Sequence, residues 1–223
     1  MASSRDPSGP RPLGRPRAAD SSATRKRIID AARRLFATSG YERTTNKDIA
    51  REAGLTTGPL YHYFASRVDL YSEVFRECIE RIYDRFDKVA AEAGGLIPAL
   101  CAVADDAVAL QAEDPTLASF LSSANADVHR YHELAELMAY HKKRAAALWG
   151  SVVDAGIAAG EVPDDVDRKG VAGMIGAIFS GFAQFADRTD RRTHAQSIEA
   201  FKLLVQGQLI LAPSDSRRSR SRR

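Results

Sequence analysis

Cysteine, tryptophan and methionine are scarce in this chain of 223 residues, which contains two, one and three of them. Two cysteines cannot build a disulfide framework, and both Cys78 and Cys101 lie in apolar patterns of helical spacing. We therefore expect two buried thiols, with a redox pair as the alternative. The N-terminus is polar and arginine-rich rather than apolar, so no secretory signal is expected and the cytoplasm is the expected location.

Long apolar runs and alternating patterns are also missing. The longest apolar run, residues 171–186, is too short for a membrane span and includes Gln184. No segment alternates convincingly with a period of two, as a half-buried strand would. The hydrophobic content of 44% and the mean hydropathy of -0.30 are those of a soluble globular protein. The sequence therefore predicts an all-α fold.

Catalytic motifs are absent as well. There is no glycine-rich phosphate loop, no Gly-x-Ser-x-Gly elbow and no His-Glu-x-x-His pattern. On a single helix, His129, His132 and Glu136 would put three metal ligands on one face. A solvated helix face explains the same spacing, and this is our interpretation. The sequence predicts neither an enzyme nor a cofactor or metal site.

The net charge is only +3, but it is unevenly distributed. Residues 1–27 contain seven basic and two acidic residues, and residues 213–223 contain five arginines and one aspartate. The segment between them is therefore acidic. Such a distribution confines the binding of polyanions to particular places on the molecule.

The basic N-terminal segment, residues 1–22, is rich in Pro, Arg, Ser and Gly and is expected to be a disordered arm. Within it, Leu13 to Arg17 resembles the core of an AT-hook, whose arginines, here Arg15 and Arg17, enter a narrow minor groove. A solvated tail is the alternative. The Ser/Arg-rich residues 213–223 are expected to form a disordered tail.

The most informative pattern runs from Thr44 to Arg67. It predicts a helix capped by Thr45, a turn at Gly54 and a second short helix that begins near Thr56. Two helices joined by a few residues at a glycine form a helix-turn-helix, whose second helix enters the major groove of DNA. The predicted core of this unit with its preceding helix is Ile28, Leu35, Phe36, Ile49, Leu60 and Phe64.

This stretch, with the predicted helix from Thr24 to Ser39 before it, resembles the DNA-binding domain of TetR-type transcriptional repressors. The resemblance is carried by Thr45, Ile49, Ala50, Ala53, Gly54, Gly58, Leu60, Tyr61, Tyr63, Phe64 and the segment from Ser66 to Leu70. The chain departs from the usual pattern at Asn46, where the family commonly has an apolar residue, at Pro59, and at Arg67, where it usually has lysine.

The DNA contacts are predicted from position on the second helix and are supported by the resemblance. We expect base-edge contacts from Thr56, Thr57, Gly58, Tyr61 and Tyr63, with Gly58 allowing close approach of the backbone. The phosphate contacts are expected from Thr45, Tyr61, Arg67 and the N-terminal amides of both helices. Core positions for Tyr61 and Tyr63 are the alternative.

Beyond the motif, only helices are predicted. Their expected ranges are Ser66–Ala93, Pro98–Ala112, Thr116–Ala126, His129–Ala159, Val166–Arg188 and Thr193–Leu211. The expected domains are a helix-turn-helix domain over residues 23–68 and a helical effector-binding and dimerisation domain over residues 69–212, between the arm (1–22) and the tail (213–223).

Small residues in the late helices predict a seam for a second subunit. The resemblance implies that the last two long helices pair with their copies in a four-helix bundle, and a buried helix within one chain is the alternative. The candidate interface residues are Gly173, Gly176, Ala177, Ser180, Gly181, Phe201 and Leu204. A two-fold dimer would space two recognition helices for a near-palindromic operator.

The resemblance also implies a pocket for a small-molecule effector. Its candidate lining residues are bulky and lie on several helices: Tyr83, Phe86, Phe120, Met138, Tyr140, Trp149, Phe179 and Phe182. A ligand that binds better to the state unable to span both half-sites would release DNA. The sequence thus predicts a homodimeric DNA-binding repressor released by an effector. A helical ligand-binding or metal-binding protein or enzyme with a merely structural helix-turn-helix is the alternative.

Overall fold

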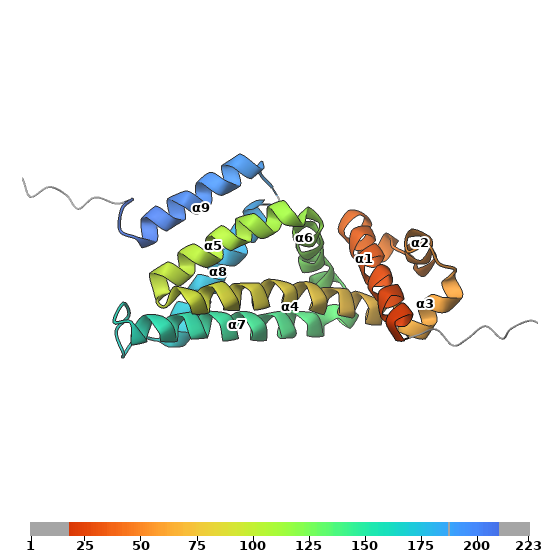
Figure 1. The fold of residues 1–223 in the computed structure, drawn as a ribbon, viewed down its shortest axis with the longest axis horizontal. Coiled ribbons are helices and arrows are strands. Elements are labelled where there is room, and N and C mark those ends of the chain that lie inside the picture. The colour runs from red at the N-terminus through yellow and green to blue at the C-terminus, as the bar shows by residue number, and fades with distance from the viewer. Residues whose placement is uncertain (1–17, 187, 210–223) are drawn as a thin grey trace, which may run out of the picture.

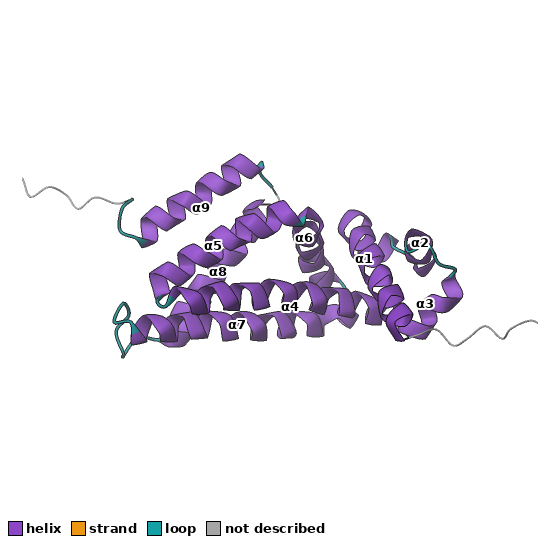
Figure 2. Cartoon of the chain, viewed as in Figure 1, coloured by secondary structure: helices purple, strands orange, loops and turns teal. Residues whose placement is uncertain are grey.

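The computed structural model describes residues 18–186 and 188–209, and every regular element in this part of the chain is helical (Figure 2). This confirms the predicted all-α fold. The elements are α1 (Ala18–Arg43), α2 (Asn46–Glu52), α3 (Thr57–Tyr63), α4 (Arg67–Ala93), α5 (Leu96–Glu113), α6 (Pro115–Arg130), the 3-10 helix η1 (His132–Leu134), α7 (Ala135–Ala158), α8 (Arg168–Ala186) and α9 (Arg191–Val205).

Helices α1, α2 and α3 form a small unit, here called the head, at one end of an elongated molecule (Figure 1). Five of its six predicted core residues are buried: Ile28, Phe36, Ile49, Leu60 and Phe64. The sixth, Leu35, is partly buried and packs against the same cluster. The apolar positions that the sequence predicts for the core therefore pack together in the head.

Helix α1 is longer than predicted. It begins at Ala18, inside the segment expected to be a disordered arm, because Ala18 and Ala19 favour a helix. Its range runs to Arg43, but the backbone is not helical at Gly40, where φ is 75° and ψ is 169°. These backbone angles are essentially restricted to glycine. The chain therefore bends at Gly40 before it enters α2.

The caps of the helix-turn-helix follow the sequence closely. The Thr45 hydroxyl accepts a hydrogen bond from the Asp48 amide, and the Asp48 carboxylate accepts one from the Thr45 amide in return. Ser66 caps α4 in the same way through the amide of Asp69. Gly54 has the positive φ of 68° expected after α2. Thr56 precedes α3 but makes no side-chain cap bond.

Helix α4 runs from the head along the whole body, with α7 beside it (Figure 1). Helices α5 and α8 complete the layer around them, and α9 packs on α5 and α8 at the end far from the head. None of the helices within residues 18–186 and 188–209 is long and apolar enough to cross a membrane.

The predicted helix from His129 to Ala159 is wrong at its start. Helix α6 continues to Arg130, Tyr131 is extended, and η1 separates it from α7. Tyr131 is held away from the helix by its ring contact with Tyr41 and its hydrogen bond to Glu42. His129 and Glu136 consequently lie on different helices, and the described residues contain no cluster of His, Cys, Asp or Glu able to hold a metal.

The head joins the body through an aromatic cluster. Phe36 and Tyr41 of α1 pack against Tyr71 of α4 and Phe120 of α6, with ring centroids between 4.8 and 6.5 Å apart. The carboxylate of Asp127 on α6 accepts hydrogen bonds from the Tyr41 amide at 3.2 Å and the Tyr71 hydroxyl at 3.1 Å. This contact fixes the end of α1, and hence the start of α2, against the body.

Candidate nucleic-acid interface

Helix α3 presents a polar outer face with little side-chain bulk. Thr56, Gly58 and Tyr61 are exposed, and Thr57 is half-buried. A Cβ atom added at Gly58 would have no neighbour within 4 Å among residues 18–186 and 188–209 outside its own helical turn, so the space beside this residue is open. The hydroxyl groups of Thr56 and Tyr61 are therefore exposed to solvent on the outer face of α3.

Tyr61 and Tyr63, which were predicted to contact DNA together, point in different directions. Tyr61 is 53% exposed, and its hydroxyl lies 3.3 Å from the side-chain nitrogen of Asn46 on α2. Tyr63 is half-buried against the core and lines a groove with Phe64 and Val68. Tyr61 is therefore exposed on the outer face of α3, whereas Tyr63 packs partly against the core.

Arg67 is engaged inside the head. Its Nη1 donates to the backbone carbonyls of Glu42 at 3.3 Å and Thr44 at 3.2 Å. Its guanidinium carbon lies 4.2 Å from the centre of the Tyr41 ring. These contacts fasten the link between α1 and α2 to the first residue of α4. Arg67, which was predicted to contact phosphate, thus also has a structural role that the sequence analysis did not predict.

The Thr45 hydroxyl is also occupied. It donates to the Asp48 carboxylate at 2.6 Å, and this hydrogen bond lowers the pKa of Asp48. Thr45 is nevertheless exposed at the N-terminus of α2, beside Lys47, which is exposed too. Among the residues not predicted as contacts, His62 is exposed on α3 next to Tyr61. Arg15 and Arg17 lie outside the described residues.

Comparison with known proteins agrees with this geometry. The family model described as "Bacterial regulatory proteins, tetR family" matches residues 28–74, which include α2, α3 and the start of α4. The HTH-type transcriptional repressor KstR2 of Rhodococcus jostii (strain RHA1) is 28% identical over 151 residues, covering 66% of this chain and 71% of the relative. The chain belongs to the tetR family. It is a DNA-binding transcriptional repressor of that family, which is not a family of enzymes.

Solved structures extend the similarity of this tetR-family chain to its body. Salmonella enterica GusR superposes with a TM-score of 0.67 at 26% identity, over 84% of this chain and 95% of the other. FadR from Bacillus subtilis in complex with stearoyl-CoA gives a TM-score of 0.67 at 24% identity, over 82% of this chain and 98% of the other. The body of this repressor therefore has the same fold.

Six of the eight predicted effector-pocket residues of this tetR-family repressor fall into three separate groups. Phe120 packs in the aromatic cluster between head and body, not in the centre of the body. Tyr83 and Phe86 contact each other on α4, and the Tyr83 hydroxyl lies 3.0 Å from Nε2 of His141 on α7. The third group, around Trp149, Phe179 and Phe182, packs against Phe201. Met138 is partly buried, and Tyr140 donates a hydrogen bond to Glu80.

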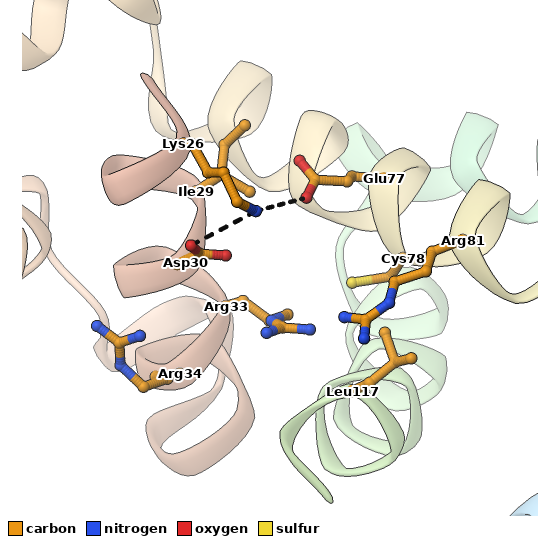
Figure 3. Close-up of a pocket in the computed structure, with 9 residues that line it drawn as sticks. All are labelled: Lys26, Ile29, Asp30, Arg33, Arg34, Glu77, Cys78, Arg81 and Leu117. Atoms are coloured by element: carbon orange, nitrogen blue, oxygen red, sulfur yellow. Dashed lines mark ion pairs between the residues drawn. The ribbon is translucent and has the colours of Figure 1, made fainter. Parts of the chain in front are cut away.

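A cavity of about 290 Å³ lies between α1, α4 and α6, at the junction of head and body (Figure 3). Its charged groups are paired: Lys26 with Asp30 and Glu77, and Arg34 with Glu52. The Arg33 and Arg81 guanidinium groups, which point toward one another in Figure 3, share the carboxylate of Asp114. Because these charges balance, we interpret the cavity as part of the structural contact between head and body, held by ion pairs.

The face of α8 that points away from the chain is apolar. Five of the predicted interface residues are exposed: Gly173, Ala177, Ser180, Gly181 and Leu204. Gly176 instead faces the Trp149 ring, and Phe201 is buried against Phe179 and Phe182. The sequence prediction missed the large exposed side chains on the same two helices, which are Met174, Ile178, Phe185 and Leu203. On α8 these side chains are spaced by four and seven residues, and this helical spacing was the signal that could have revealed them.

Proposed function

We propose that this repressor acts as a homodimer on a near-palindromic operator and is released from it by a small-molecule effector. The observation that carries the proposal is the distribution of its two unpartnered faces. The polar face of α3 lies on the head, and the exposed apolar face of α8 and α9 lies on the half of the body away from the head (Figure 1). A two-fold axis at the apolar face would leave both heads free for DNA.

Each head would insert α3 into a major groove. Thr56, Thr57 and Gly58 would lie at the base edges, and the exposed Tyr61 hydroxyl would reach a phosphate oxygen. The N-terminal amides of α2, beside Thr45, would contribute a second phosphate contact. Tyr63 and Arg67 would act by holding the head together. The site of action would be the cytoplasm, where a bacterial operator is located.

The effector would bind in the body and change the position of the head. Asp127 and Asp114 form hydrogen bonds that join α6 to α1 and α4. A shift of α6 would therefore move α1 and α4, which flank the helix-turn-helix. The FadR structure contains stearoyl-CoA. We therefore propose acyl-CoA thioesters as the first chemical class to test, against the corresponding free acids.

The decisive experiment has two steps. Fragments of the host genome that bind the full chain are first selected, and the recovered operator is then titrated by fluorescence anisotropy with and without acyl-CoA thioesters. We expect one near-palindromic sequence, released by a thioester but not by its free acid. Recovery of fragments without a common sequence would contradict the proposed operator, and release by none of the thioesters would contradict the proposed effector class.

The dimer is tested separately by placing a charge on the apolar face. We expect Ile178→Glu to convert the dimer to a monomer in sedimentation velocity and to weaken operator binding, because a carboxylate would be buried between two copies. Ala139→Glu, at an exposed position of α7, is the control and should leave the dimer intact. A wild-type chain that sediments as a monomer at micromolar concentration would exclude the proposed assembly.

A further inference from the structure

Asn46 is the first residue of α2, and its side chain reaches across the helix-turn-helix to α3. Its Nδ2 donates a hydrogen bond to the Tyr61 hydroxyl at 3.3 Å. The contact joins residues that are 15 positions apart in the chain. It is the direct side-chain link between the start of α2 and the exposed tyrosine of the recognition helix.

The other end of the Asn46 amide has no partner. Its Oδ1 is buried and accepts no hydrogen bond from the described residues. A buried polar atom without a partner costs stability, and an apolar side chain of similar shape would avoid that cost. The Oδ1 atom of Asn46 therefore adds nothing to the stability of the head, and the hydrogen bond from Nδ2 to Tyr61 is the contact that this amide contributes.

The direction of this hydrogen bond decides what Tyr61 can offer to DNA. A tyrosine hydroxyl has one proton to donate and two lone pairs that accept. Phosphate oxygens of the DNA backbone only accept. Because the Asn46 amide donates to Tyr61, the single hydroxyl proton remains free for a phosphate oxygen.

We propose that Asn46 is a positioning residue for DNA binding, whose amide holds the Tyr61 hydroxyl in place as a donor to the phosphate backbone. The proposal rests on the phosphate contact of Tyr61 proposed above. Asn46 itself need not touch DNA. Its effect on affinity should therefore depend on the presence of the tyrosine hydroxyl.

The test is a double-mutant cycle with wild type, Asn46→Leu, Tyr61→Phe and the double variant, all measured on the selected operator by anisotropy. Asn46→Leu should weaken binding about threefold to tenfold when Tyr61 is present, the size expected for one hydrogen bond. In the Tyr61→Phe background the same change should have no effect. Urea unfolding of Asn46→Leu should show unchanged or higher stability, because the unpartnered Oδ1 is removed.

Asn125→Leu is the matched control, because Asn125 is exposed on α6 in the body, and it should leave operator affinity unchanged. An equal loss from Asn46→Leu in the wild-type and Tyr61→Phe backgrounds would overturn the positioning role, as would no loss in either. A wild-type chain that binds no operator would instead overturn the proposed function, so the two failures are distinguishable.

Discussion

At the scale of single residues, Gly58 is notable because it contributes by having no side chain. It lies in the first turn of α3, is exposed, and a Cβ atom added to it would have no contact within 4 Å in the described part of the chain, apart from its own turn of helix. Nothing within the described protein therefore requires glycine here. The proposed close approach of α3 to the floor of the major groove does.

We predict that Gly58→Ala raises stability and lowers operator affinity. Alanine is favoured over glycine in a helix by up to about 1 kcal/mol, and the methyl group would stand between the helix and the bases. Urea unfolding and anisotropy titration measure the two effects. Gly150→Ala on α7, where a Cβ also has free space, should raise stability without affecting DNA binding. Unchanged affinity of Gly58→Ala would contradict close approach at this residue.

The direction of each side chain was predictable only where it depends on the helix alone. Tyr61 is exposed because it follows the buried Leu60 by one position, a relation fixed by helical geometry. Arg67 turns inward because Tyr41 and the Thr44 carbonyl receive it, and these partners lie more than twenty positions earlier in the chain. Contacts of this kind cannot be obtained from local spacing.

At the scale of helices, Asp114 joins three elements at once. Its Oδ1 caps α6 through the Leu117 amide, and its Oδ2 accepts from Arg33 on α1 at 2.8 Å and Arg81 on α4 at 2.7 Å. Burial raises the pKa of Asp114, but the hydrogen bonds from Thr116 and Arg33, together with the positive charges, outweigh it and hold that pKa at about 2. The carboxylate therefore stays charged throughout the physiological pH range.

Asp114→Asn should weaken the contact between α1, α4 and α6. The amide can keep the cap, but it leaves two guanidinium groups without a counter-charge. We expect a loss of about 2 kcal/mol in the free energy of unfolding, less than for a fully buried pair because the Arg81 side chain is half exposed. Asp105→Asn removes the carboxylate of a more exposed pair with Lys202 and should have little effect. Equal unfolding curves for the two variants would show that the Asp114 ion pairs do not stabilise the fold.

Helix ends were predicted well where a cap lies in the sequence beside the helix. Thr45 with Asp48 and Ser66 with Asp69 are such cases, and both helices begin where expected. The break at Tyr131 was missed because no glycine or proline marks it and its cause is the distant Tyr41. The same reason explains the divided pocket residues: bulk and apolarity identify core side chains but not which of them share a cavity.

At the scale of the whole molecule, the half-buried His141 and the buried His194 make stability depend on pH. Burial lowers the pKa of His141 in the body and of His194 at the start of α9, although a hydrogen bond to the Phe182 carbonyl partly opposes this at His194. A histidine whose pKa is lower in the folded state binds protons better when unfolded. Its contribution is complete above the unfolded pKa of about 6.5 and is lost as the pH falls below that value.

We therefore predict that the free energy of unfolding decreases between pH 7.5 and pH 5.5, as measured by urea titration in buffers of equal ionic strength. Replacing His141 by glutamine should make the decrease shallower, while His62→Gln at the surface of α3 serves as the control. A wild-type stability that rises over this interval would show that the histidines are not the dominant titrating groups.

The bend at Gly40 predicts that substitutions at this position would lower the amount of the protein in a living cell. Its backbone angles exclude other residue types, so a substituted chain would be degraded and its abundance would fall. A Gly58 variant, by contrast, would remain abundant but would bind the operator with lower affinity. A mutant library sorted first by protein level and then by reporter expression would lose changes at Gly40 in the first sort and changes at Gly58 only in the second.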